Sequence, residues 1–505
     1  MKLNNRNRMS GVRVTYSGLI SFGINLISIV TGLIFTTIIT RQLSQEEFAV
    51  WGLIGVFTGY MLVVEPIISF WTVREIARGD NSGKTALLSS GLFSFISISA
   101  YILVAYLFGN ASGVDLDVLF FTAILIPVRF FRHVVSQINL GHAPQITAYG
   151  LLVFEVVKVI LGVITIYFFE MGLMGVIITV FIATLGAVIY SIIRSREVLR
   201  GKFEKEFLKK WLKMFWLPTF PQISKLVFSS DVVIFTIIIG SVEEVAYWFV
   251  AMTIASIILH STNISKAIYT KMLQGGNKLF FQQNSERLLY FLFPLTAMAI
   301  TFSEPGLFIL NPNYQVAYPI VIFLSLGIFF QALGRVFQEP LSGIEKVDIN
   351  LKSTFKDYLK SKLVFFPTLR LIQRASYLAS LAIILLLLNP IIEEKFDLII
   401  YWSILFLIIQ IPHTFYLYKL AKKEFKASFN FILIFKYILT SIVSFGITFI
   451  IMKEYLEYRE NPFEFIPQLI PFAILSITLY LVITILIDNK TRKLINSILS
   501  ELKNR

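Results

Sequence analysis

The chain has no cysteine and few charged residues. Without cysteine it forms no disulfide, and it offers no thiolate for a metal ion or for nucleophilic catalysis. Only 15% of its 505 residues are charged, whereas soluble globular domains carry about 25%. Hydrophobic residues make up 56% of the chain, and the mean hydropathy is +0.75. This composition excludes a soluble enzyme and indicates a polytopic membrane protein.

Long polar segments are also scarce, because apolar stretches fill most of the chain. A helix needs about 20 mainly apolar residues to cross a bilayer, since its backbone N–H and C=O groups must bond within the segment. Fourteen stretches predict an all-α polytopic fold with about 14 transmembrane helices. The predicted spans are 14–40, 48–71, 86–108, 117–140, 146–168, 172–193, 214–240, 243–265, 286–304, 315–337, 369–391, 397–418, 430–452 and 466–487.

Basic residues collect in alternate connections between these spans. Short loops rich in Lys and Arg stay in the cytoplasm during insertion, so both termini are predicted to be cytoplasmic. The few basic residues expected on the opposite side are Arg41, Lys395, Lys453 and Arg459. The net charge of +14 then reflects a cytoplasmic rim facing anionic membrane lipids, and no nucleic-acid partner is expected.

The longest connections divide the chain into expected domains. We expect an N-terminal six-helix bundle over 1–195, a cytoplasmic linker over 196–213, a C-terminal six-helix bundle over 214–420, and two appended helices with a basic tail over 421–505. Within the second bundle, the connector 338–368 has leucine and phenylalanine at four-residue spacing, with lysines between them. This pattern predicts either a basic amphipathic helix in the interface or a cytoplasmic extension of the next span.

A faint repeat relates the two predicted bundles. The matched residues, offset by 197 positions, are Glu46, Glu47, Ala49 and Trp51 with Glu243, Glu244, Ala246 and Trp248. The same offset superimposes the first six spans on the next six. Because both halves begin on the same side, they are predicted to be parallel repeats, with a substrate between them and access that alternates between the two sides.

Four stretches carry a likeness to known transporters. They are IITRQLSQEEFAVWGL (38–53), INLGHAP (138–144), LPTFPQISKLVFSSDVVIFTIIIGSVEEVAYW (217–248) and SEPGLFILNPNYQVAYPIVIFLSL (303–326). In these stretches the chain resembles the polysaccharide biosynthesis or O-antigen flippase family of the multidrug/oligosaccharidyl-lipid/polysaccharide exporter superfamily. It departs from the family pattern at Ala49, where a glycine is usual.

The resemblance implies a flippase that moves a polyprenyl-linked oligosaccharide from the cytoplasmic to the external leaflet by alternating access. The implied location is the cytoplasmic membrane of a prokaryote. The implied partners are a polyprenyl phosphate- or pyrophosphate-linked glycan, anionic membrane lipids and other membrane proteins of polysaccharide assembly. No cofactor is expected, and a coupling ion, if transport uses one, is expected to be H⁺ or Na⁺.

Ionisable residues inside the predicted spans are the candidate site residues, because each costs about 2.5–3.5 kcal/mol to insert. Lys225 is expected to contact an anionic head group, and Asp231 a sugar hydroxyl or a coupling ion. Six residues place these two about 240° apart around a helix, so they cannot share a face. Pro218 and Pro221 precede them and are expected to kink the helix as a gate requires. An interhelical structural contact is the alternative for both charges.

Further candidates lie in the first half. Glu65, followed by the gating candidate Pro66, is expected either to titrate or bind Na⁺, or to pair with a basic residue. Arg129 and Arg132 share a helix face and fit a pyrophosphate, although snorkelling to lipid phosphate is also expected of such residues. Arg41 fits a family motif or a helix cap. Glu155 and Lys158, three residues apart, are expected to neutralise each other, and no metal-ligand spacing is present.

Two rival functions remain. A drug or cation antiporter of the same superfamily shares the twelve-helix core but favours acidic cavity residues and has less need of two appended helices. A membrane glycosyltransferase, polymerase or ligase requires acidic or arginine-rich external loops, and the connection 109–117 offers only Asp115 and Asp117. We therefore expect a transporter and not an enzyme.

Overall fold

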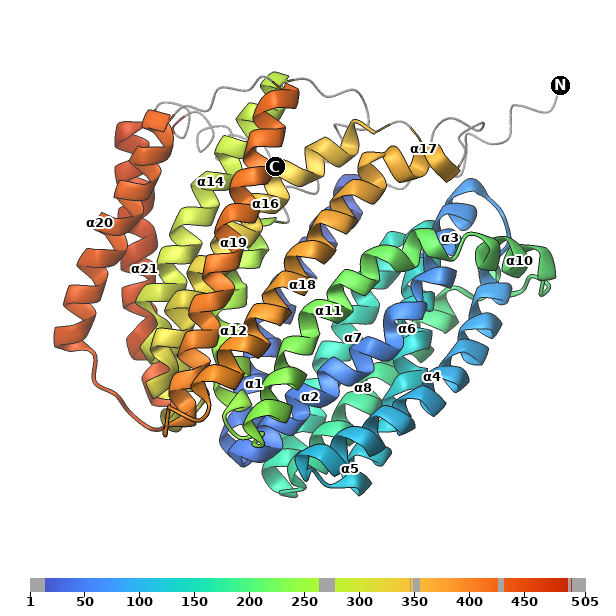
Figure 1. The fold of residues 1–505 in the computed structure, drawn as a ribbon, viewed down its shortest axis with the longest axis horizontal. Coiled ribbons are helices and arrows are strands. Elements are labelled where there is room, and N and C mark those ends of the chain that lie inside the picture. Colours follow the sequence, from blue (N-terminus) through green and yellow to red (C-terminus); the bar gives the residue numbers. More distant parts are fainter. Residues whose placement is uncertain are drawn as a thin grey trace. The chain divides into compact units, whose positions relative to one another are not determined.

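The computed structural model describes residues 14–262, 278–345, 347, 355–425, 431–488 and 492. All regular structure in these ranges is helical (Figure 1). Eleven helices of the described chain are long and apolar enough to cross a membrane, or twelve if a pair bent by 62° between Thr301 and Ser303 counts as one span. The chain is a multi-pass membrane protein, and the predicted all-α class is confirmed.

The predicted count of fourteen spans exceeds this number by two or three. The spans predicted at 14–40 and 243–265 coincide with shorter apolar helices, Ile27–Gln42 and Val245–Ser261. Residues 263–265 lie outside the described ranges. The count of fourteen therefore stays a prediction, although the described part of every predicted span is mainly helical.

The chain divides by its internal contacts into a unit that ends at Ala246 and a unit that begins at Tyr247. The finer domain limits predicted from the loops stay predictions. The main helices of the first unit are α1 (Val14–Gln42), α2 (Gln45–Met61), η2 (Leu62–Val64), α3 (Pro66–Arg78), α4 (Gly83–Ser112), α5 (Leu116–Phe121), η3 (Thr122–Ile124), α6 (Leu125–His142), α7 (Pro144–Gly162), η4 (Val163–Phe168), α8 (Gly172–Arg194), α9 (Arg196–Leu199), α10 (Lys205–Lys213) and α11 (Trp216–Ile239).

Within the first unit, α7 packs against α1 and α8, and α6 packs against α3, α4 and α8. α11 lies along α2 and α3 (Figure 1). The side chains that face away from these contacts are apolar. On α4, the side chains of Phe95 and Ile96 are 72% and 63% exposed. Such an apolar surface would be unfavourable in water and is expected where a helix faces lipid.

The predicted span 48–71 is broken in its middle. α2 ends at Met61, the single 3₁₀ turn η2 follows, and α3 starts at Pro66. Proline lacks the N–H that would continue an α-helical ladder, but it is well tolerated in the first turn of a new helix. The break places Glu65 at the junction, where its backbone N–H donates to the carbonyl of Leu62.

The second unit contains α12 (Val245–Ala255), which begins at the unit boundary, and η5 (Ser256–Thr262). The remaining elements are α14 (Lys278–Thr301), α15 (Ser303–Leu310), η6 (Pro312–Ala317), α16 (Tyr318–Gly343), α17 (Phe355–Lys360), α18 (Lys362–Leu388), α19 (Lys395–Phe425), α20 (Phe431–Tyr455) and α21 (Pro462–Ile487).

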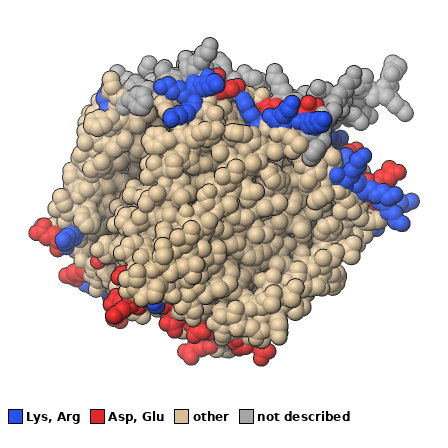
Figure 2. Space-filling model, in the orientation of Figure 1, with Lys and Arg blue, Asp and Glu red and all other residues tan. Residues whose placement is uncertain are grey.

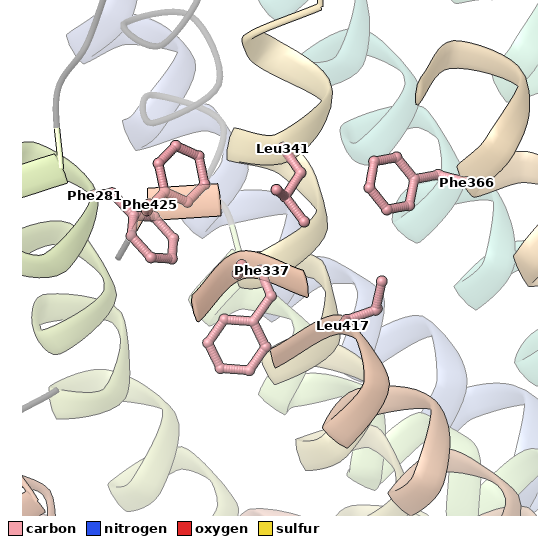
Figure 3. Close-up of a cluster of buried hydrophobic side chains, with 7 residues drawn as sticks. Phe281, Phe337, Leu341, Phe366, Leu417 and Phe425 are labelled. Atoms are coloured by element: carbon pink, nitrogen blue, oxygen red, sulfur yellow. The ribbon is translucent and has the colours of Figure 1, made fainter. Parts of the chain in front are cut away.

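Close packing of α16 on α19 organises this unit. At Gly327 an added Cβ would lie 2.5 Å from the Phe406 ring, so only glycine permits this approach. Nearby, the rings of Trp248 and Trp402 stack at 3.7 Å between centroids. Figure 3 shows a buried apolar cluster at one end of the unit, contributed by α14, α16, α18 and α19: Phe281, Phe337, Leu341, Phe366, Leu417, Ala421 and Phe425.

The appended pair α20–α21 is held to α14 by tyrosines. The Tyr480 hydroxyl donates to the backbone carbonyl of Tyr290 at 2.6 Å, and the Tyr437 hydroxyl donates to Asp488 at 3.0 Å. The rings of Tyr290, Tyr437 and Tyr480 pack at about 5.3 Å between centroids. This contact fixes the pair to the second unit, so it is not a loose extension.

Charged side chains collect at the helix ends of each unit, and an uncharged band lies between them (Figure 2). In the first unit, α3, α8, α9 and α10 bring together the basic end, whereas the opposite end carries Glu46, Asp115, Asp117, Glu170 and Glu243. In the second unit, lysines at 356, 360, 362, 419, 422 and 423 occupy one end. Basic side chains therefore gather at one end within each unit, and the predicted cytoplasmic location of that end stays a prediction.

The faint repeat includes a shared turn. Ser44 and Glu47 form a capping box at the start of α2, with Glu47 N–H bonded to Ser44 Oγ at 3.1 Å. At the same offset of 197, the hydroxyl of Ser241 donates to the carboxylate of Glu244 before α12. The bonds differ, because Ser44 caps α2, which starts at the next residue, whereas α12 starts four residues after Ser241.

The connector predicted over 338–368 contains the end of α16, the short helix α17 and the start of α18. It also contains residues that the structure does not describe. α16 continues to Gly343, α17 is a separate helix of 6 residues, and α18 starts at Lys362, seven positions before the predicted span. Residues 346 and 348–354 lie outside the described ranges. Residues 362–368 therefore belong to α18, and the choice between the two expectations for the amphipathic stretch before them stays open.

Candidate functional site

The candidate site is a cavity of about 650 Å³ within the first unit, walled by α2, η2, α3, α6 and α11. Its apolar lining comes from residues such as Leu62, Val63 and Phe228. The lining residues that bear polar or ionisable groups are Tyr60, Glu65, Ser69, Arg74, His133, Gln137, Gln222, Lys225 and Ser229. A concavity in which polar groups converge between apolar walls is typical of a ligand site.

Glu65 lies at the break between α2 and α3 and is 4% exposed. One carboxyl oxygen accepts a hydrogen bond of 2.9 Å from the Ser69 hydroxyl, one turn along α3. The other oxygen, Oε1, is buried and has no hydrogen-bond partner in the structure. A carboxyl group with one unsatisfied buried oxygen is suited to binding a proton or a cation.

Lys225, on α11, lines the same cavity as Glu65. Lys225 is an exposed residue. Pro221 lies one turn earlier inside the same helix, and Pro218 is buried near its start. Because Pro221 has no N–H, it removes one bond from the ladder of α11. Separately, the Ser224 hydroxyl donates to the Pro221 carbonyl at 3.0 Å. The prolines and the charged residue therefore occupy the same half of α11.

Basic groups outnumber acidic groups in this cavity. Lys225, Arg74 and the histidine His133 line it, whereas Glu65 is the acidic lining residue. The Arg74 guanidinium packs over the Phe70 ring at 3.6 Å and donates to the Phe70 carbonyl at 2.6 Å. Glu65 immediately precedes α3, and Arg74 lies near the end of this helix, toward the basic end of the unit. At a rise of 1.5 Å per residue, the cavity therefore extends about 13 Å along α3.

Asp231 does not line the cavity. It is 3% exposed, and its carboxylate accepts a hydrogen bond of 2.8 Å from the backbone N–H of Val232. Beside it, the hydroxyl of Tyr60 contacts that of Ser230 at 3.0 Å. Lys225 and Asp231 thus point to different sides of α11, as their spacing predicts.

Arg129, Arg132 and Arg41 lie outside this cavity's lining. The Arg129 guanidinium donates to the Thr58 hydroxyl between α6 and α2. Arg132 packs over the Phe154 ring at 3.8 Å and lines a second cavity of about 340 Å³ beside α7 and α8. Arg41 lies in the last turn of α1, at the acidic end. Pro66 lines the cavity next to Glu65.

The predicted neutralisation of Glu155 by Lys158 is confirmed. Lys158 Nζ lies 2.6 Å from a carboxylate oxygen of Glu155, and both side chains are buried. The hydroxyls of Ser28 and Thr31 on α1 donate to the same carboxylate at 2.8 and 2.7 Å. This network joins α1 to α7 inside the unit.

The sequence analysis missed the uncharged half of the lining. His133 and Gln137 are one turn apart on α6, and Gln222, Lys225 and Ser229 follow a helical spacing on α11. Polar residues three or four apart within an apolar span were the available signal. In the part of the chain that the structure describes, no cluster of His, Asp or Glu has the geometry of a metal site.

No protein-family model matches the sequence, and no curated protein matches it either. Solved structures do match. An inward-facing multidrug resistance MATE family transporter of the MOP superfamily superimposes with a TM-score of 0.59 at 11% identity, over 81% of this chain and 99% of that one. An outward-facing multidrug resistance MATE family transporter matches with a TM-score of 0.55 at 14% identity, over 82% and 95%. The chain has the fold of these transporters.

A third match is a MOP superfamily transporter from Pyrococcus furiosus, with a TM-score of 0.53 at 12% identity, over 83% of this chain and 96% of that one. For that protein, a binding pocket of reversed polarity suggests a different function. At identities of 11–14% the likeness concerns the fold. The fold that the sequence resemblance implied is therefore confirmed, and the likeness goes no further than the fold.

Proposed function

We propose that the chain is a transporter that moves a polyprenyl-linked oligosaccharide from the cytoplasmic to the external leaflet. Its place is the cytoplasmic membrane of a prokaryote, with the basic ends of both units and both termini in the cytoplasm. The transported molecule is a glycan linked to polyprenyl phosphate or pyrophosphate. Other membrane proteins of polysaccharide assembly would supply or take up this molecule.

The cavity of the first unit carries this proposal. Lys225, Arg74 and His133 supply positive or ionisable nitrogen at its wall, which suits a phosphate or pyrophosphate. Tyr60, Gln137, Gln222 and Ser229 supply hydrogen-bonding groups for sugar hydroxyls. A volume of about 650 Å³ lies within the range of small-molecule sites and accommodates a head group with its first sugars.

In this proposal Lys225 binds the anionic head group and Glu65 binds the coupling ion, a proton or Na⁺. The free oxygen of Glu65 is the feature that supports the second role. Pro66 and the two prolines of α11 lie in the walls that would move as access alternates. Arg129, Arg132 and Asp231 would then hold the bundle together beside the path, and Arg41 would lie at its external end.

A drug or cation antiporter is the second candidate. It is favoured by the buried carboxyl of Glu65 and by the fold shared with multidrug transporters. It differs from the first candidate in cargo charge: a cationic drug would be repelled by Lys225 and Arg74, whereas an anionic head group would be attracted. An enzyme of polyprenyl-linked glycan chemistry is disfavoured by the transporter fold.

The deciding experiment measures leaflet accessibility in sealed vesicles that contain the purified protein. A polyprenyl-pyrophosphate oligosaccharide with a fluorescent label is added, and a membrane-impermeant reagent modifies whatever glycan reaches the outer leaflet. Wild type should expose the glycan faster than empty vesicles, and Lys225→Ala should reduce the rate. Lys213→Ala, which removes an exposed lysine of α10, should not change it.

The same vesicles loaded with a cationic dye test the antiporter. Dye movement with no movement of glycan would overturn the flippase proposal. Glycan movement that is insensitive to Lys225→Ala would keep the transporter and remove Lys225 from its site.

A further inference from the structure

The second cavity of the first unit lies on a different side of α6 from the candidate site. It holds about 340 Å³ and is walled by α1, α6, α7 and α8, which pack on one another (Figure 1). Arg132 and Ser136, one turn apart on α6, line this second cavity. His133 and Gln137, each one residue further along, line the candidate site. α6 therefore carries a polar pair on each of two faces, and the proposed function uses one of these pairs.

The Arg132 guanidinium keeps its hydrogen-bonding capacity in this structure. It packs over the Phe154 ring of α7 at 3.8 Å, which is a contact between its charge and the ring. Within the described chain, its N–H groups make no hydrogen bond and no ion pair. Burying such donors without partners is costly. The packing role given to Arg132 above therefore leaves its N–H groups available to a ligand.

Two hydroxyl groups in the wall of the second cavity are available in the same way. They belong to Ser136 on α6 and to Ser191 on α8, and neither forms a hydrogen bond to any described residue. An added Cβ at Gly150 of α7 would lie 2.8 Å from Ser191 Oγ, so glycine gives this hydroxyl its place. The Thr147 hydroxyl, in contrast, donates to the Ser136 carbonyl at 3.2 Å. Three side chains from two helices thus offer donors to one space.

Positive charge exceeds negative charge around the second cavity. Glu155 is the single acidic residue in the sequences of α1, α6, α7 and α8. It attracts Arg132, but its carboxylate is already held by Lys158 at 2.6 Å and by two hydroxyls of α1. Arg129, one turn before Arg132, repels it. A negatively charged ligand would therefore be attracted to this cavity, whereas a cation would be repelled.

The second cavity has room for a phosphate group with a small group attached to it. Its volume falls at the lower end of the range of small-molecule sites, which is about 300–1,000 Å³. Ser191 lies three residues before the end of α8, about 4.5 Å from the basic end of the unit. Leu140, near the end of α6, also lines the cavity and is 47% exposed. The cavity therefore lies close to the surface of the unit at its basic end.

We propose that Arg132, Ser136 and Ser191 bind a phosphate group in the second cavity. A guanidinium fork binds two phosphate oxygens at once, and the hydroxyls donate to the others. Arg129, which the sequence analysis paired with Arg132, donates instead to the Thr58 hydroxyl and takes no part. The phosphate belongs either to a lipid head group or to a soluble phosphate ester. The proposal goes beyond the transport proposed above and holds whichever cargo the first cavity carries.

The first arm of the test uses a soluble phosphate ester and the full chain in non-ionic detergent. Isothermal titration with glycerol 3-phosphate, in chloride buffer of constant ionic strength, should show binding by wild type. Arg132→Gln should weaken binding about tenfold or more, because charge-assisted hydrogen bonds are lost. Ser191→Ala should weaken it about threefold, the effect of one neutral hydrogen bond. Arg200→Gln, which alters an exposed arginine, is the matched control and should bind like wild type.

A further variant separates the two cavities. Lys225→Ala alters the lining of the candidate site and leaves the second cavity intact, so binding that depends on Arg132 should persist in it. Binding that Lys225→Ala abolishes and Arg132→Gln retains would place the phosphate in the candidate site and overturn the proposal.

The second arm of the test uses lipid. Full chain taken from phosphatidylcholine vesicles, with and without phosphatidylglycerol, is analysed by native mass spectrometry for retained lipid. Retention of phosphatidylglycerol by wild type and by Arg200→Gln, but not by Arg132→Gln, assigns the site to a lipid phosphate. Binding of glycerol 3-phosphate that depends on Arg132, without such retention, assigns it to a soluble phosphate ester.

Equal binding by wild type, Arg132→Gln and Ser191→Ala in both arms would overturn the proposal and leave Arg132 its packing role alone. If Arg132→Gln does not fold, Ser191→Ala decides, because it removes a hydroxyl that bonds to no described residue and leaves every charge in place. Failure of this test leaves the leaflet assay untouched, since that assay follows glycan movement and these arms follow binding.

Discussion

The indole N–H of Trp211 donates to the carboxylate of Glu75, with the nitrogen 3.3 and 3.2 Å from its two oxygens. Both residues are almost fully buried. Lys210 adds an ion pair of 2.9 Å to the same carboxylate. Trp211 belongs to α10, in the connection after α8, and Glu75 to α3. This contact therefore anchors the linker to the basic end of the first unit.

Removing this carboxylate should destabilise the first unit. Glu75→Ala leaves the buried indole N–H without an acceptor, which costs about 1–3 kcal/mol. Glu75→Gln keeps an acceptor and should cost less. Lys210→Ala should cost under about 1 kcal/mol, since Lys210 is 54% exposed. Melting of the purified protein in detergent measures the three effects, and equal loss for Lys210→Ala and Glu75→Ala would contradict this account.

Gly327→Ala should destabilise the second unit. The new methyl group would lie 2.5 Å from the Phe406 ring and 3.4 Å from the Leu407 backbone, so α16 and α19 must separate. Such overpacking costs about 1–3 kcal/mol. Gly446→Ala on α20 meets nothing within 4 Å and is the matched control. Because glycine weakens helices, this control should be neutral or stabilising by up to about 1 kcal/mol, as thermal melting will show.

Tyr480→Phe should loosen the appended helices. It removes the hydroxyl that donates to the Tyr290 carbonyl and leaves that carbonyl without this partner, at a cost of about 0.5–1.5 kcal/mol. Hydrogen exchange in α20 and α21 should accelerate relative to wild type. Tyr416→Phe, which alters a tyrosine that is 43% exposed, should leave exchange unchanged. If hydrogen exchange instead accelerates equally throughout the second unit, the substitution destabilises the whole unit and the prediction of a local effect is wrong.

Glu65→Gln should remove the dependence of transport on an imposed ion gradient. The amide oxygen of glutamine still accepts from Ser69, so the break between α2 and α3 keeps its bond, but the side chain no longer binds a proton or Na⁺. Glycan movement is measured with a proton or sodium gradient and without one. Glu197→Gln, an exposed acid on α9, should retain the wild-type dependence. A full response to the gradient in Glu65→Gln would remove this residue from coupling.

Hydropathy predicted where the helices lie, because the bilayer demands long apolar segments and the described part of each predicted span is mainly helical. It did not predict the breaks. The span at 48–71 contains Pro66, which was expected to mark a gate, but the turn at Leu62–Val64 depends on local backbone bonding that composition does not encode. The spacing of Lys225 and Asp231 did predict that they face different sides, because helical geometry alone decides it.

Arg335, Arg370 and Arg374 were not among the predicted site residues, because two predicted spans end several residues away from the ends of the helices. With spans at 315–337 and 369–391, Arg335, Arg370 and Arg374 fall at the ends, where basic residues are ordinary. α16 runs to Gly343 and α18 starts at Lys362, so all three lie well inside their helices. Amphipathic segments next to a span make its boundary hard to locate from hydropathy alone.

Lys158 gives the first unit a counter-ion that cannot diffuse away. Because the ammonium group is attached one turn from Glu155 and lies 2.6 Å from its carboxylate, its local concentration does not depend on the salt outside. Sodium or potassium must displace a tethered charge, as well as the hydroxyls of Ser28 and Thr31, to reach that carboxylate. The join between α1 and α7 should therefore be insensitive to which cation fills the surrounding solution. If Glu65 binds the coupling ion as proposed, the response of transport to ionic composition should depend on Glu65 and not on Glu155.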